Sequence, residues 1–161
     1  MLLSNLEITN IFEKFNSLKV LVIGDVMVDS YLWGKVDRIS PEAPVPIVVV
    51  NKSENRLGGA ANVALNLKSL GATTILCSVI GDEPKGNLFN ELLEKQKLTT
   101  KGIVKNKNRI TTSKNRIIGN NSQMLRIDEE IESFLCEEDT FNFYKVINFY
   151  KVNRVNLRKL F

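Results

Sequence analysis

The residues best suited to hold a polar ligand are a glycine pair and two aspartates in the N-terminal half of the chain. Gly58 and Gly59 precede a run with apolar residues at helical spacing, and a helix N-terminus offers free N–H groups to anions and polar ligands. Asp25 and Asp29 follow the apolar run 19–23, where carboxylate oxygens can accept from hydroxyl groups. A plain turn for the glycines and a cap or turn for each aspartate are the alternative interpretations.

A second polar cluster lies near residue 114. Lys114 and Arg116 are two residues apart within the stretch 111–116, so they lie on the same face of a predicted strand. Two cations on one face can clamp a phosphate group. Solvated charges on the surface of a strand are the alternative, and this stretch alone does not decide between the two.

The motifs of common nucleotide-binding loops and metal sites are absent. No Gly-Lys-Ser/Thr and no Gly-x-Gly-x-x-Gly occurs, so a P-loop or Rossmann nucleotide site is disfavoured. The chain has no histidine, which excludes a histidine base and histidine-ligated metals. Cys77 and Cys136 follow no metal-ligand or redox spacing. We interpret them as two reduced thiols.

Strands and helices alternate along the part of the chain that must position these residues. Residues 2–18 are predicted as a short amphipathic helix. Residues 19–25 and 73–80 are apolar runs typical of strands buried on both faces of a parallel sheet. A helix is predicted between the glycine pair and Gly71, and another over 84–97. This alternation predicts an α/β fold with right-handed crossovers.

The remaining segments depart from that alternation. Residues 45–50 are a β-rich run with Pro41 and Pro44 before it and Pro46 at its start, and these prolines suit an edge or a lid. Residues 101–128 indicate short strands, and the break at Gly119-Asn120-Asn121 predicts a hairpin. The acidic stretch 129–139 is predicted as the solvated start of a helix. The basic segment 140–161 nearly repeats a six-residue unit and does not continue the pattern.

Composition indicates one soluble globular domain or a large piece of one. The chain has 161 residues, of which 43% are hydrophobic and 25% charged, an ordinary globular mix. Five of the 22 basic residues and none of the 18 acidic ones lie in segment 140–161. The rest of the chain is therefore near neutral, and a basic groove for nucleic acid is not predicted. We expect neither a signal peptide nor a membrane span, because the N-terminal segment lacks a long apolar run.

In combination, these segments resemble the ribokinase (PfkB) family of carbohydrate kinases. The resemblance covers about residues 17–135. Within the family, the sequence is most similar to the kinase domain that acts on D-glycero-β-D-manno-heptose 7-phosphate, and the discriminating stretches are RISPEAPVP at 38–46 and TTSKNR…QMLRID over 111–128. The remaining motifs that carry the resemblance are GDVMVD at 24–29, GGAANVA at 58–64, Leu70-Gly71-Ala72 and Ile80-Gly81-Asp82.

The resemblance implies the N-terminal part of a three-layer α/β/α fold with a small β lid. Asp29 matches the family aspartate that hydrogen-bonds sugar hydroxyls. Gly58, Gly59 and Asn62 match the glycines and asparagine that line the sugar pocket.

Segments 31–50 and 108–126 resemble the lid strands, which close over the sugar and form the dimer contact in many relatives. Lys114 and Arg116 are then the candidates for binding the phosphate that the substrate already carries, a role inferred from their charge and position.

The catalytic motif of the family does not occur in the sequence. Family members carry their catalytic aspartate in a C-terminal Gly-Ala-Gly-Asp motif, where it acts as base for the attacking hydroxyl. The intact enzyme would use ATP and Mg²⁺ to phosphorylate the anomeric hydroxyl, a step in making ADP-heptose for lipopolysaccharide. Neither that motif nor the ATP-binding region around it is found here. We therefore assign no catalytic, cofactor-binding or metal residue and expect this chain alone to be inactive.

These observations divide the chain into three segments. Residues 1–18 are predicted as the amphipathic helix, 19–139 as an incomplete ribokinase-like sugar-binding domain, and 140–161 as an anomalous basic tail that is out of register with the fold, as after a frameshift.

Two other functions stay open: another PfkB sugar kinase, and a non-catalytic module for sugar-phosphate binding or dimerisation. The expected partners are a sugar phosphate and a second copy bound through the lid strands, without nucleic acid or membrane, in the cytoplasm.

Overall fold

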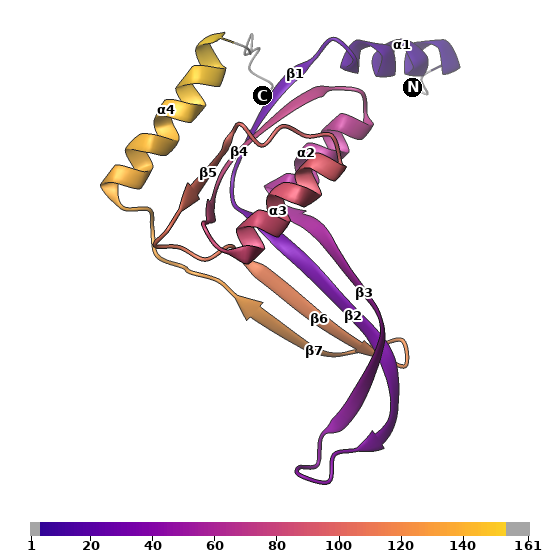
Figure 1. Ribbon diagram of the computed structural model, residues 1–161. Coiled ribbons are helices and arrows are strands. Elements are labelled where there is room, and N and C mark those ends of the chain that lie inside the picture. Colours follow the sequence, from indigo (N-terminus) through magenta and orange to yellow (C-terminus); the bar gives the residue numbers. More distant parts are fainter. Residues whose placement is uncertain (1–3, 154–161) are drawn as a thin grey trace.

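The computed structural model describes residues 4–153 and places their strands in two sheets (Figure 1). The core sheet has the order β1-β4-β5, and the projecting sheet, which extends away from the body, has the order β3-β2-β6-β7. The core strands are β1 (Lys19–Ile23), β4 (Thr73–Gly81) and β5 (Ile103–Asn106). The projecting strands are β2 (Val26–Ile39), β3 (Pro46–Gly59), β6 (Ser113–Gly119) and β7 (Ser122–Glu129). The helices are α1 (Asn5–Phe15), α2 (Ala60–Ser69), α3 (Pro84–Lys95) and α4 (Glu137–Asn153).

The core sheet is parallel and carries helices on both faces. β1 pairs with β4, and β4 pairs with β5, all in parallel. Alternate side chains of β1 and β4 point to opposite faces. Val22 and Leu76 pack in the cluster with α2 and α3, whereas Leu21 and Ile75 pack with α4. This arrangement confirms the predicted α/β fold class.

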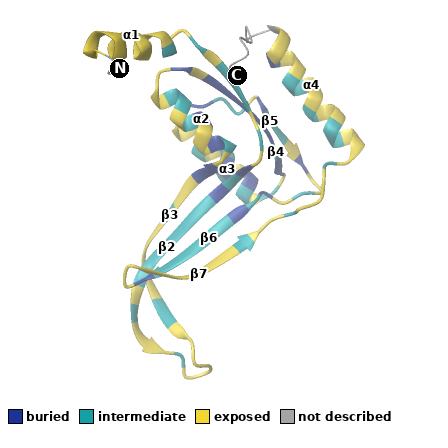
Figure 2. Cartoon of the chain, turned by 180° about the vertical axis from the view of Figure 1, so that it is seen from behind, coloured by how far each residue is buried: buried dark blue, intermediate teal, exposed yellow. Residues whose placement is uncertain are grey.

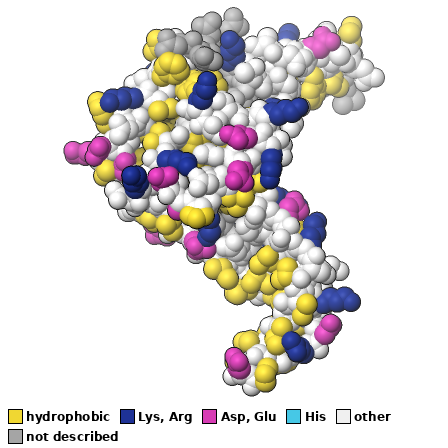
Figure 3. Space-filling view, viewed as in Figure 1, with side chains coloured by type: hydrophobic (Ala, Val, Ile, Leu, Met, Phe, Trp, Pro, Cys, Tyr) yellow, Lys and Arg dark blue, Asp and Glu magenta, His cyan; other side chains and the backbone are white. Residues whose placement is uncertain are grey.

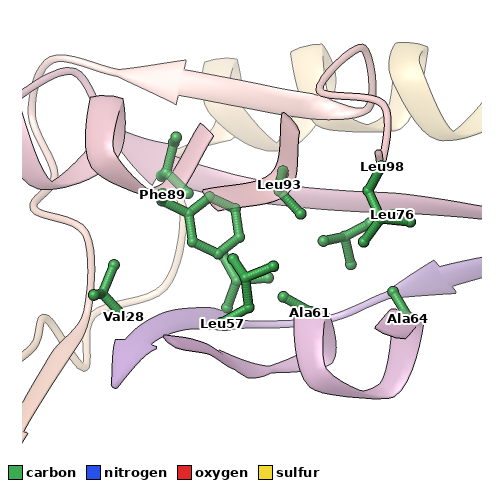
Figure 4. Packing of buried hydrophobic residues seen from close by; sticks show 10 residues of the cluster. Val28, Leu57, Ala61, Ala64, Leu76, Phe89, Leu93 and Leu98 are labelled. Atoms are coloured by element: carbon green, nitrogen blue, oxygen red, sulfur yellow. The ribbon is translucent and has the colours of Figure 1, made fainter. Parts of the chain in front are cut away.

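The main hydrophobic core lies between the sheets and the two helices α2 and α3 (Figure 4). Phe89 and Leu93 of α3 are fully buried and pack in one cluster with Ala61 and Ala64 of α2. Alanine at both α2 positions lets the helix approach the strands closely. Buried residues concentrate where α2 and α3 meet the strands, while the far end of the projecting sheet is exposed (Figure 2).

The projecting sheet starts inside this core. Val28 of β2 is 1% exposed and pairs with Leu57 of β3 and Ser113 of β6. The predicted hairpin is confirmed: β6 and β7 are antiparallel, and Asn120 and Asn121 between them have φ of 50° and 66°. Asparagine is among the few residues that tolerate this left-handed conformation, so it suits a two-residue turn.

Glu83 fixes the connection between the two sheets. It caps α3 by accepting hydrogen bonds from the N–H groups of Lys85 and Gly86, and it also accepts from the N–H of Thr111, just before β6. Burial opposes ionisation of this carboxyl, but the hydrogen bonds outweigh it and lower the pKa of Glu83. The start of α3 and the entry to the projecting sheet are therefore held by one carboxylate.

Residues 140–153 continue the α/β alternation. We predicted a separate tail over 140–161, but the structure places the boundary at 139 inside α4, and residues 154–161 lie outside the described residues. Tyr150 is 5% exposed and packs with Ile75 and Cys77 of β4. The pKa of the Cys77 thiol is raised by this burial to about 11. Both copies of the near-repeat contribute to this packing, because Phe143, Val146 and Ile147 of the first copy pack against the same cluster.

We predict that Tyr150→Ala lowers the melting temperature of the chain by several degrees, because removing a buried aromatic side chain costs about 3 kcal/mol. Tyr144→Ala is the matched control, since Tyr144 lies on the same helix but is 59% exposed, and it should leave the melting temperature nearly unchanged. Thermal unfolding followed by circular dichroism measures both. Equal melting temperatures for the two variants would show that α4 does not pack in solution.

Candidate functional site

The predicted site residue Asp29 lies on β2, directly after the buried Val28. Because side chains alternate along a strand, Asp29 points away from α2 and α3. Its Oδ1 accepts a hydrogen bond from Nη1 of Arg116 at 2.5 Å, and the two side chains are 19% and 22% exposed. This bond raises the pKa of Arg116. Asp29 and Arg116, 87 residues apart in the chain, thus form a partly buried ion pair.

The glycine pair lies against both aspartates. A side chain at Gly58 would overlap Oδ2 of Asp29 and the side chain of Met27. Gly59 has φ of 60°, and a side chain there would overlap the backbone carbonyl of Asp25. That carbonyl also accepts from the N–H of Ala60 at 2.8 Å, at the start of α2. Gly58 therefore leaves space for the side chains of Asp29 and Met27, and Gly59 is required both for space and for backbone conformation.

The other predicted residues extend the site in two directions. Asn62 lies exposed in the first turn of α2. Lys114 follows Ser113 on β6 and contacts Asp128 at 3.2 Å and Glu130 at 3.7 Å. Burial opposes ionisation of Asp128, but the hydrogen bond from Lys114 and the charge of Arg126 outweigh it, so the pKa of Asp128 is lowered.

The structure thus brings Asp29, Gly58 and Arg116 into contact and leaves Asn62 in the adjoining helix. Lys114 and Arg116 lie on the same strand face, as predicted, but each is paired with a carboxylate: Arg116 with Asp29, and Lys114 with Asp128 and Glu130. Their phosphate-binding role stays a prediction.

An aromatic pair that we did not predict continues the face of Asp29. Tyr31 and Trp33 stack with ring centroids 5.3 Å apart and an interplanar angle of 14°. Arg116 and Arg56 lie 5.1 and 4.8 Å from the Tyr31 ring. Asp29, Tyr31 and Trp33 are spaced two residues apart, which is the period of a strand. This spacing could have predicted from the sequence that all three lie on one face. Such a surface of rings and cations suits ligands with both apolar and anionic parts.

A cleft of about 500 Å³ opens at the carboxyl ends of β1 and β4. Its lining includes Asp25 and Ser78 together with Arg109, Glu130 and Ser133. Ligands of open α/β sheets bind at such strand ends. Arg109, which we did not single out from the sequence, donates to the carbonyls of Ile131 and Ser133 at 3.3 and 2.9 Å, and so holds the wall of the cleft in place.

The described residues offer polar groups rather than a metal centre. Within residues 4–153, no group of three or more acidic, cysteine or histidine side chains is placed to hold a metal ion. Over the body of the molecule, positive and negative side chains are interspersed on the face seen in Figure 3. Among the helices that the structure describes, none is long and apolar enough to cross a membrane.

Residues 17–146 match the family described as pfkB family carbohydrate kinase. The match extends into α4, beyond the region where we recognised the resemblance.

Over the matched region, curated relatives are about 50% identical in sequence to this chain. The bifunctional protein HldE of Helicobacter pylori (strain HPAG1) is 53% identical over 114 residues, which are 71% of this chain and 25% of that protein. The HldE of Desulfatibacillum aliphaticivorans is 49% identical over 124 residues, 77% of this chain and 25% of that protein. The chain therefore spans about a quarter of the length of the curated relatives it matches.

Solved structures of sugar kinases share the fold at low sequence identity. A putative sugar kinase from Clostridium perfringens superposes with a TM-score of 0.59 and 19% identity, covering 81% of this chain and 40% of its own. A putative ribokinase from Agrobacterium tumefaciens has a TM-score of 0.58 and 18% identity, covering 78% and 42%. Since the family match alone takes in four-fifths of the residues, this chain belongs to the pfkB family of carbohydrate kinases.

Proposed function

We propose that this chain is the sugar-binding part of a kinase that acts on D-glycero-β-D-manno-heptose 7-phosphate. The observation that carries the proposal is the contact between Asp29 and Gly58, which joins two separate motifs of the sequence at one polar face. The identity of about 50% to HldE proteins favours a heptose phosphate over other sugars.

In this proposal the charged groups of the site have separate roles. Asp29 accepts hydrogen bonds from sugar hydroxyls through the oxygen that Arg116 leaves free. Gly58 and Gly59 leave room for the sugar ring, and Asn62 offers an amide at its rim. Arg116 and Lys114 bind the 7-phosphate after exchanging their carboxylate partners for it, because arginine and lysine both bind phosphate oxygens through charge-assisted hydrogen bonds.

The proposed phosphoryl donor is ATP with Mg²⁺, as the family membership suggests. The ribokinase from Cryptococcus neoformans, which superposes on this chain with a TM-score of 0.51 and 20% identity, was solved in complex with ADP. When bound, the ATP–Mg²⁺ pair supplies the phosphoryl group. Residues 4–153 contain no acidic cluster that fits Mg²⁺, so we assign no step through that pair to these residues.

Two other functions are distinguished by their ligands. Another PfkB sugar kinase would bind a different sugar at the same face. A non-catalytic module would bind sugar phosphate, or a second copy through the projecting sheet, without needing further kinase polypeptide. The long, open edge strand β3, with Val45, Val49 and Val50 about half exposed around it, makes the projecting sheet the proposed dimer contact.

We predict that Asp29→Asn weakens binding of heptose 7-phosphate at least about tenfold, because a hydrogen bond to a charged acceptor contributes roughly 1.5–3 kcal/mol. Isothermal titration calorimetry of the full chain measures the dissociation constant. Asp37→Asn is the control, since Asp37 is an exposed aspartate on the same strand, and its affinity should equal that of the unchanged chain. An equal loss in both variants, or no binding by the unchanged chain, would remove the sugar site from this face.

We predict that Lys114→Ala weakens binding of heptose 7-phosphate more than binding of the unphosphorylated heptose, because only the phosphorylated sugar presents an anion. The ratio of the two dissociation constants is the measured quantity. Lys35→Ala, at an exposed lysine of β2, should leave that ratio unchanged. Equal weakening for both sugars by Lys114→Ala would exclude Lys114 from the phosphate site.

We predict that the purified chain does not phosphorylate heptose 7-phosphate with ATP above background, because its 161 residues contain no Gly-Ala-Gly-Asp motif. Formation of ADP with heptose 7-phosphate, compared with a sample without sugar, measures the activity. Turnover that Asp29→Asn abolishes would show that these residues suffice for catalysis.

A further inference from the structure

Helix α1 forms without burying any of its described residues, Asn5–Phe15, in the rest of the molecule. It lies at the end of the molecule opposite the tip of the projecting sheet (Figure 1). A capping box between Ser4 and Glu7 closes its N-terminus. Eleven residues are nevertheless too few for a stable isolated helix in water, because most helical stability in proteins comes from packing an apolar face. The helix therefore needs a further contact that covers such a face.

The apolar residues of α1 lie together on one side of the helix. Ile8, Ile11, Phe12 and Phe15 follow the spacing i, i+3, i+4 and i+7, which places them in one stripe. Ile8, Ile11 and Phe12 are 40%, 41% and 50% exposed. The rings of Phe12 and Phe15 meet edge to face with their centroids 5.6 Å apart. This stripe is a continuous apolar surface that is open to a partner.

One flank of the apolar stripe carries two opposite charges. Glu7 and Lys14 are seven residues apart, close to two turns, so they lie on the same flank near opposite ends of the helix. The capping box uses Oε2 of Glu7 and leaves Oε1 to accept from another donor. The exposed Lys14 takes part in none of the ion pairs among residues 4–153. The other flank carries the uncharged Asn5 and Thr9.

We propose that α1 is a self-association surface that pairs with α1 of a second copy in antiparallel orientation. A two-fold axis near Ile11, perpendicular to both helices, sets the two apolar stripes against each other and brings like flanks together. Glu7 of each copy then meets the partner's Lys14, and the helix dipoles oppose each other. In a parallel pair, the charged flank would face the uncharged flank of the partner, and neither charge would be matched.

A second copy fits this helix better than a membrane surface does. The helix carries two acidic residues and one basic residue, whereas helices that lie on membranes are rich in lysine and arginine on their polar face. The match to the kinase family begins at residue 17, after α1. The paired surface of one short helix is smaller than a standard protein interface, so we expect a weak dimer that depends on protein concentration.

The test is sedimentation equilibrium of the full chain over roughly a hundredfold range of protein concentration. We expect a monomer–dimer equilibrium. Ile11→Asp puts a carboxylate into the apolar stripe and should weaken the dimer about tenfold or more. Leu6→Asp is the matched control, since Leu6 is 71% exposed on the opposite side of the helix, and it should leave the equilibrium unchanged. A monomer at every concentration, or a dimer that Ile11→Asp leaves intact, would overturn the proposal.

Two charge variants test the antiparallel alignment. Lys14→Glu gives the flank two acids, and Glu7→Lys gives it two bases. Each variant alone should associate about tenfold more weakly than the unchanged chain, because two attractive pairs become two repulsive ones. An equimolar mixture of the two should associate again, since every acid then faces a base. The loss of the capping box in Glu7→Lys cannot produce this rescue.

A mixture that stays monomeric would overturn the antiparallel alignment. Binding of the chain to phosphatidylglycerol vesicles that Ile11→Asp abolishes, without self-association, would assign the stripe to a membrane instead. None of these measurements needs sugar or ATP, so their outcome does not depend on the proposed function.

Discussion

The position of the whole candidate site depends on strand β2 of the projecting sheet, which begins inside the hydrophobic core. Val28 is held under α2 and α3 with 1% exposure, and a strand cannot turn two successive side chains to the same face. Once Val28 is buried, Asp29 must point to the opposite face, and Tyr31 and Trp33 must follow it. A shift of β2 by one residue would bury a carboxylate and expose a valine, which the core does not allow.

The polar face is electrically balanced without a ligand, and this limits how it can bind one. Arg116 is paired with Asp29, and Lys114 lies between Asp128 and Glu130. The face therefore has little net charge to attract an anion. An anion that binds there must make better hydrogen bonds to Arg116 and Lys114 than the carboxylates that it replaces. A phosphate can do so, because its oxygens suit the fork of an arginine. In the proposed function, partner exchange would couple the two roles, because a phosphate bound to Arg116 would leave both oxygens of Asp29 available to hydroxyl groups.

Local pattern was sufficient to predict most of the elements but not the contacts between them. The apolar runs predicted β1 and β4, and Asn120-Asn121 predicted the turn between β6 and β7, because each of these features is encoded within a few residues. The ion pair of Asp29 with Arg116 depends on the parallel register of β2 and β6, which no local signal contains. The start of a helix was predicted within 129–139, but the body of α4 was interpreted as a tail, because apolar residues of the near-repeat occur all round the helix and obscure its buried face.

The segment from Gly24 to Val26 links the cleft to the polar face of the projecting sheet. On its N-terminal side, β1 ends at the cleft; on its C-terminal side, β2 carries Asp29 into the projecting sheet. The carbonyl of Asp25 is bound by the first N–H of α2, and the space beside it is kept free by Gly59. Asp25 therefore joins the end of β1, the start of α2 and the glycine pair at one place in the fold. In the proposed function, this connection would place a sugar bound on the projecting sheet near the carboxyl ends of the core strands, where ligands of open α/β sheets bind.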